Sequence, residues 1–306
     1  MTSGRRTLPL GFAAILAATR GQAQTRASPA AGYRAHAVRT PDGLSIATQE
    51  WGNPAGPEIL FIHGYSQCFL SWAKQTGDAD LLREFRIITY DLRGHGGSDK
   101  PLDGARYKDG PAWAAEMQVV METTGLRRPV VVPWSYGGRV IADYLNAYGP
   151  GRLAGVNYVG AAVKAGPPFA GTEVAPLLGG MVRPEAEQNI ASTRAFLRAC
   201  FQRQPAAEDF ETMIAFNMLC PWQARAGMNG RALDIDVMMR SLRLPVLVTH
   251  GRQDRLWTPA MAEHTAALVP GAQLSFYDGV GHSTFWEDAP RFNRELAEFV
   301  RRASRT

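Results

Sequence analysis

The stretch VVVPWSYGG, residues 130–138, places a serine and two glycines directly after an apolar run. The run predicts a buried strand, and the apolar spacing of residues 139–148 predicts a helix. Ser135 therefore stands at a turn from strand to helix. Such a turn either exposes a nucleophilic hydroxyl at the helix N-terminus or simply caps the helix with an ordinary serine.

Apolar runs and helical patterns alternate on both sides of this turn. The first two runs flank the turn signal of residues 39–43 and predict an antiparallel hairpin. The predicted strands are residues 33–38, 44–51, 58–64, 85–91, 129–133, 153–160, 245–251 and 272–279, and further helices are expected at 109–124 and 291–303. This order predicts an α/β fold, with a mostly parallel, twisted sheet covered by helices on both faces.

The strand pattern is interrupted between residues 164 and 240, which are rich in Ala, Met, Phe, Arg and Pro. We expect a mostly helical cap there, over the carboxyl edge of the sheet. Residues 24–163 and 241–306 would then form the core.

The first 23 residues have the order of an export signal. Arg5 and Arg6 precede an apolar stretch that begins at Leu8, and small residues follow up to Ala23. The paired arginines resemble a twin-arginine signal. We therefore predict a periplasmic or secreted protein whose mature chain has no integral membrane segment.

Charge argues against a nucleic-acid partner. The 306-residue chain has 33 basic and 28 acidic residues. Removal of Arg5, Arg6 and Arg20 with the leader leaves a net charge of +2. No remaining cluster of Lys and Arg would follow a phosphate backbone. The partner expected from the motifs described below is a small-molecule ester substrate, and the oligomeric state stays open.

The three cysteines allow two interpretations. An oxidising compartment would permit a disulfide between Cys200 and Cys220, whereas Cys68, Cys200 and Cys220 could equally be buried thiols. No Cys or His spacing is typical of a metal site, and we expect neither a metal nor a cofactor.

A serine needs a base, and the base needs an orienting acid. His282 lies in a glycine-containing loop after the last predicted strand, where it can reach the carboxyl edge of the sheet. Asp254 follows the strand that ends near His250. Asp91, the alternative carboxylate, precedes Arg93 and is expected to hold its own loop.

Ser135, Asp254 and His282 follow one another along the chain in the order nucleophile, acid, base. This is the chain order of the triad in the α/β-hydrolase superfamily, which the sequence resembles. The matching strings are FIHGYSQ (61–67), YDLRGHGGSDKP (90–101), WSYGG (134–138), GRQDRLWTP (251–259) and GVGHSTFWEDAPRFN (279–293). They span nearly all of the expected mature chain. WSYGG also resembles serine esterases and the cofactor-free haloperoxidase, or perhydrolase, group.

The resemblance implies an oxyanion hole made by the backbone N–H groups of Tyr65 and Tyr136. It implies structural roles for His63 and His95. The chain departs from the family's Gly-x-Ser-x-Gly pattern at Pro133, which puts the detailed geometry of the turn in doubt.

The expected activity is cleavage of carboxylic esters, including lactones, with small to medium apolar acyl groups. The same triad would also serve a perhydrolase, and a ligand-binding protein without activity is a third interpretation. Candidate substrate contacts are Trp134, Phe285, Trp286, Phe216 and Trp222, all aromatic residues that could equally belong to the core.

Overall fold

The computed structural model describes residues 1, 32–229, 231–232 and 235–305. The predicted export signal therefore lies outside the described residues, apart from Met1. Within the described part of the chain, we find no helix with the length and apolar character needed to cross a membrane.

Eight strands form one sheet in the order β1-β2-β4-β3-β5-β6-β7-β8. The strands are β1 (Arg34–Arg39), β2 (Ser45–Gly52), β3 (Glu58–Ile62), β4 (Arg86–Tyr90), β5 (Val130–Pro133), β6 (Gly155–Val159), β7 (Val246–Gly251) and β8 (Gln273–Tyr277). β2 pairs antiparallel with both β1 and β4, and all other pairs are parallel. Each predicted strand is present, and the predicted mostly parallel α/β architecture is confirmed.

Helices cover both faces of the sheet because the central strands are apolar on both sides. Ile59 and Phe61 of β3 pack in one core, and Leu60 and Ile62, which alternate with them, pack in the other. The first core is completed by α1 (Ala73–Thr76), α2 (Ala79–Glu84), α11 (Thr284–Glu287) and α12 (Ala289–Ala303). The second core contains α3 (Gly110–Thr124), α4 (Gly137–Tyr148) and α10 (Pro259–Leu268).

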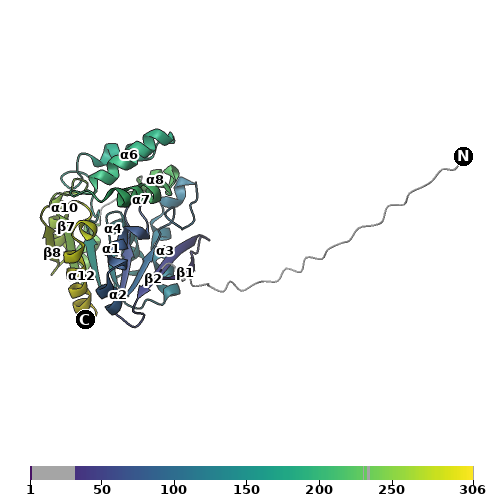
Figure 1. The fold of residues 1–306 in the computed structure, drawn as a ribbon. Coiled ribbons are helices and arrows are strands. Elements are labelled where there is room, and N and C mark those ends of the chain that lie inside the picture. Colours follow the sequence, from purple (N-terminus) through teal and green to yellow (C-terminus); the bar gives the residue numbers. More distant parts are fainter. Residues whose placement is uncertain (2–31, 230, 233–234, 306) are drawn as a thin grey trace.

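The stretch between β6 and β7 is helical in the structure. It contains α5 (Val174–Met181), α6 (Ala186–Ala199), α7 (Ala207–Met218), α8 (Trp222–Asn229) and α9 (Asp236–Ser241). The short helices η1 (Phe69–Trp72) and η2 (Gly104–Tyr107) lie earlier in the chain, and η2 contacts α8. In Figure 1, α6, α7 and α8 lie at one end of the molecule, opposite the end where α12 finishes.

The three cysteines are free thiols, and all are buried. Of the two alternatives left open by the sequence, the structure therefore has the thiols, and it contains no Cys200–Cys220 disulfide. Burial raises the pKa of each thiol above its ordinary value, because a thiolate is poorly solvated in an apolar core.

We expect the native protein to react slowly with a thiol reagent and the denatured, non-reduced protein to react rapidly at three cysteines. Burial suppresses the reactive thiolate only while the protein is folded. A colorimetric thiol titration with and without denaturant measures both values. A single reactive cysteine after denaturation would reveal a disulfide and contradict the structure.

Candidate active site

Ser135 lies between β5 and α4 with a positive φ of 52°. Its N–H donates to the Val159 carbonyl at 3.0 Å, and its carbonyl accepts from Gly138 and Ala162 at 2.9 and 3.0 Å. Tyr136 is the N-cap of α4, and no side chain caps this helix. Ser135 is therefore not an ordinary capping serine.

Pro133 does not prevent the turn. It pairs in register with Ile62 at the end of β5, and the next N–H, that of Trp134, donates to the Ile62 carbonyl at 2.9 Å. The missing N–H of the proline is thus followed at once by a regular sheet hydrogen bond. The strained backbone at Ser135 forms although the family's first glycine is absent.

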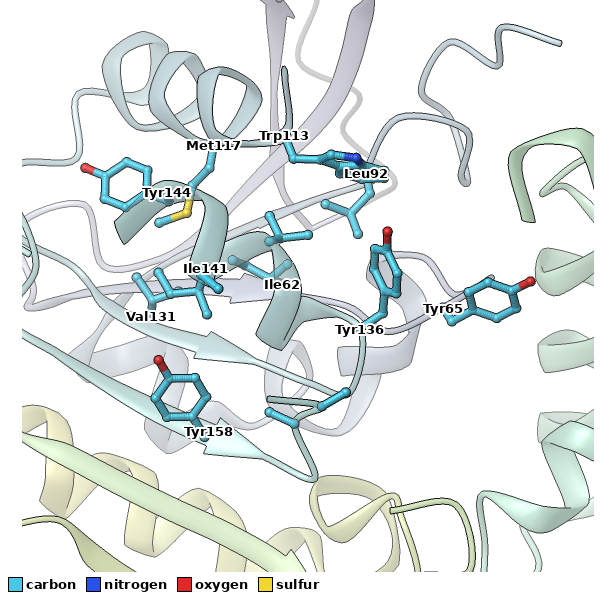
Figure 2. Close-up of a cluster of buried hydrophobic side chains, with 14 of the residues drawn as sticks. Ile62, Tyr65, Leu92, Trp113, Met117, Val131, Tyr136, Ile141, Tyr144 and Tyr158 are labelled. Carbon is cyan, nitrogen blue, oxygen red and sulfur yellow. The ribbon is translucent and has the colours of Figure 1, made fainter. Parts of the chain in front are cut away.

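The loop after β3 approaches Ser135 closely at Gly64. A Cβ atom at Gly64 would lie 3.2 Å from both the Ser135 Cβ and the Trp134 ring. This tight fit brings the next residue, Tyr65, beside the serine. Within the described chain, the backbone N–H groups of Tyr65 and Tyr136 have no hydrogen-bond acceptor. Figure 2 shows the Tyr136 side chain between those of Trp113 and Tyr65.

His282 and Asp254 form a buried pair. The Nδ1 atom of His282 lies 2.7 Å from Asp254 Oδ2, and both residues are at most 5% exposed. His282 packs against Gly160 at the end of β6, where a Cβ atom would come within 3.0 Å of Nδ1. This close contact and the positive φ of 47° both favour glycine at position 160, directly after β6, the strand that lies beside β5.

Asp254 also contacts a second imidazole. His250 Nε2 lies 3.3 Å from Asp254 Oδ2 and 2.7 Å from the Trp257 carbonyl oxygen. The N–H groups of Leu256 and Trp257 donate to Asp254 Oδ1 at 2.9 and 3.0 Å. Burial by itself would raise the pKa of Asp254, but His282, His250 and the Trp257 N–H outweigh it and hold the pKa below its usual value.

The other ring nitrogen of His282 is available for chemistry. Nε2 is buried and has no hydrogen-bond partner among the described residues. The Trp134 indole N–H donates to the His282 carbonyl at 3.1 Å. This bond fixes the backbone of His282 against the residue that precedes Ser135. An imidazole held at Nδ1 and free at Nε2 can accept a proton there.

His63, His95 and Asp91 have structural roles, as expected. His63 Nε2 accepts from the Leu92 N–H at 3.0 Å, and His95 Nε2 accepts from the Ser66 N–H at 3.2 Å. Burial lowers the pKa of both histidines, that of His95 to about 4, so they remain neutral. The Asp91 carboxylate accepts from backbone N–H groups of its own and the preceding loop.

Ser135 opens into a cavity of about 80 Å³. Its apolar wall consists of Ala162, Val174, Leu178, Phe196, Met228 and Leu256. The polar and aromatic wall consists of Tyr65, Tyr136, Trp257, Arg139 and Asn229. The helices α5, α6 and α8, in the stretch predicted to form a cap, therefore supply much of the apolar surface.

None of the predicted substrate contacts lines this cavity. Trp134 and Phe285 are buried and pack against each other at 4.8 Å between ring centroids. They line, with Phe216 and Trp286, a separate hollow of about 10 Å³. Trp222 is 38% exposed. These aromatic side chains fill the core or face solvent, since large rings bury wherever space allows.

Sequence reasoning missed Arg139 and the lining residues of the cap. Arg139 had a usable signal, because it falls in the first turn of the helix that follows Ser135. The cap residues had none. Their apolar spacing predicts helices but not which side chains meet Ser135.

No cluster of three or more His, Cys, Asp or Glu side chains able to hold a metal ion occurs in the described chain.

Comparison with known proteins identifies the family. A model described as the alpha/beta hydrolase fold matches residues 57–289. A non-heme haloperoxidase of Rhodococcus erythropolis is 29% identical, over 86% of this chain and 98% of its own. A bifunctional esterase/perhydrolase of Acinetobacter calcoaceticus is 28% identical, over 86% of this chain and 99% of its own.

Solved structures with the same fold are also similar to this chain in sequence. A protein of Burkholderia cenocepacia described as a proposed aryl esterase superimposes with a TM-score of 0.85 at 36% identity, covering 89% of this chain and 100% of its own. A Rhodococcus esterase gives a TM-score of 0.81 at 32% identity, covering 88% of this chain and 98% of its own. The chain therefore belongs to the alpha/beta hydrolase fold family, and the prediction of a hydrolase of this family is confirmed.

Proposed function

We propose that the protein cleaves carboxylic esters through an acyl-enzyme formed on Ser135. His282 removes the proton from the serine hydroxyl and later returns it to the leaving group, and Asp254 orients the imidazole. The observation that carries this proposal is the buried Asp254–His282 hydrogen bond, with a free Nε2, beside the strained turn at Ser135. The esterases among the similar proteins also support it.

The oxyanion hole is proposed at the backbone N–H groups of Tyr65 and Tyr136. Both groups lack an acceptor in the described chain, and Gly64 lets the loop of Tyr65 approach Ser135. Donors of this kind stabilise the negative charge of a tetrahedral intermediate by about 3 kcal/mol each in a site that excludes water.

The substrate we propose is an ester or lactone with a small to medium apolar acyl group. The cavity of about 80 Å³ and its mainly aliphatic wall suit such a group. A purely ligand-binding role is disfavoured, because binding alone gives no reason to bury a carboxylate against an imidazole beneath a strained serine.

Ser135→Ala should lower kcat/KM for p-nitrophenyl esters by a factor on the order of 10⁴ or more, because no other group can form the acyl-enzyme. Ser283→Ala is the matched control. It removes a buried hydroxyl without a partner in the described chain, next to His282, and should retain most of the activity. Equal activity of Ser135→Ala and the wild type would exclude the proposed nucleophile.

Asp254→Asn should lower kcat by about 10³- to 10⁴-fold, because an amide no longer stabilises the imidazolium and favours the wrong tautomer. In the wild type, the lowered pKa of Asp254 keeps it ionised as the pH falls from 7 to about 5. The carboxylate therefore stays available to the imidazole across this range. Steady-state kinetics with a p-nitrophenyl ester measure the effect of the substitution, and a wild-type kcat in Asp254→Asn would contradict the assigned role.

Peroxide is a second candidate acyl acceptor, favoured by the similarity to a haloperoxidase and a bifunctional esterase/perhydrolase. The acyl-enzyme would then pass its acyl group to hydrogen peroxide in place of water. We expect peracid formation from acetate and hydrogen peroxide by the wild type and none by Ser135→Ala. Ester hydrolysis without measurable peracid would restrict the function to esterase activity.

A further inference from the structure

One residue that lines the cavity at Ser135 is positively charged. Arg139 is the only lining residue in the described chain with a full charge, and most of the others are apolar. It lies in the first turn of α4, which begins at Gly137, two residues after Ser135. A charged side chain in the wall of this cavity is not needed to cleave an apolar ester.

Within the described chain, Arg139 has no carboxylate partner within 4.0 Å. Its Nη1 atom donates to the carbonyl oxygens of Arg231 and Ala232 at 2.6 and 3.3 Å. Its guanidinium carbon lies 5.7 Å from the centre of the Tyr136 ring. These contacts position the guanidinium and satisfy part of its donor capacity, but they bring no negative charge to it.

The Asp143 carboxylate, whose charge acts on Arg139, is already paired with another residue. Asp143 accepts two hydrogen bonds from Arg231 Nη2, at 2.6 and 2.5 Å. Arg231 also donates to the Tyr136 hydroxyl at 3.2 Å. Asp143 is thus engaged by Arg231 and not by Arg139, and the three side chains together carry one net positive charge when Asp143 is ionised.

The guanidinium of Arg139 is poorly solvated because it is largely buried. Burial lowers the pKa of Arg139, and Arg231 adds to this effect, whereas Tyr136 and Asp143 oppose it. A guanidinium in such surroundings gains most from a ligand that brings a carboxylate, because the pair is weakly screened and can form two parallel hydrogen bonds.

We propose that the enzyme selects esters that carry a carboxylate remote from the scissile carbonyl, and that Arg139 binds this carboxylate. The inference rests on the proposed ester cleavage at Ser135 and adds the substrate class. The carboxylate can belong to the acyl part, as in a half-ester of a dicarboxylic acid, or to the alcohol part. A short apolar segment would join it to the ester and contact the aliphatic wall.

Two pairs of esters test the proposal at a pH at which the carboxylates are ionised. For the acyl side, monophenyl glutarate is compared with phenyl hexanoate, which has a similar length and no charge. For the alcohol side, the acetate ester of para-hydroxyphenylpropionate is compared with that of para-butylphenol. In each pair the reacting bond is the same and only the remote charge differs. The measured quantity is the ratio of kcat/KM for the charged and neutral members.

We expect the wild type to prefer the charged member of at least one pair by about tenfold or more. Arg139→Met should abolish this preference while retaining turnover of the neutral ester, and Arg139→Lys should retain part of it. Arg128→Met is the matched control. It removes the same charge from an exposed position outside the cavity and should leave the ratio unchanged.

An unchanged ratio in Arg139→Met, or a wild type that prefers the neutral member of both pairs, would overturn the proposal. Arg139 would then only hold the segment at residues 231–232 against α4. Absence of Ser135-dependent turnover with all four esters would instead refute ester cleavage itself.

A measurement on the wild type covers the case in which Arg139→Met does not fold. Glutarate and hexanoate, the acid products of the first pair, are compared as competitive inhibitors of para-butylphenyl acetate hydrolysis. The corresponding test for the alcohol side compares para-hydroxyphenylpropionate with para-butylphenol. Tighter inhibition by a charged product supports the proposal, and weaker inhibition by both charged products overturns it.

Discussion

The backbone of Ser135 adopts a left-handed conformation, which costs a residue with a side chain about 1–3 kcal/mol and persists only where neighbouring structure enforces it. Three backbone hydrogen bonds enforce it here, and two of them come from β6 and the loop that follows. The serine is thus fixed by the middle of the sheet. The loop of Tyr65 and the ring of His282 then approach this region through Gly64 and Gly160, two positions without a side chain.

The carboxylate of Asp254 stays ionised although it is buried. Desolvation alone would favour the neutral acid, but two imidazoles and two backbone N–H groups surround the carboxylate. Their combined effect lowers the pKa of Asp254, so its charge persists beside His282. The contact with His250 means that the carboxylate is held from two sides. Its orientation therefore depends on the end of β7 as well as on the loop of His282.

The helices between β6 and β7 and helix α4 contribute different properties to the cavity. Leu178, Phe196 and Met228, on α5, α6 and α8, supply apolar surface. Arg139 on α4 supplies charge, and the apolar surroundings strengthen any interaction that it makes with a ligand. Substrate preference in this enzyme is thus proposed to depend on a single guanidinium within a mainly aliphatic wall.

The sequence by itself determined the strands and the main helices of the core, because hydrophobic periods of two and 3.6 residues are local properties. It also determined that Ser135, Asp254 and His282 follow predicted strands, because this too is read along the chain. Only the tertiary structure decided which side chains line the cavity. Trp134 and Phe285 lie near the candidate triad in sequence, yet they pack away from the cavity, whereas Leu178 and Phe196 are distant in sequence and line it. The state of the cysteines was likewise decided by packing. A cavity wall is assembled from segments that meet only after folding, and apolar spacing along one helix does not specify its partner.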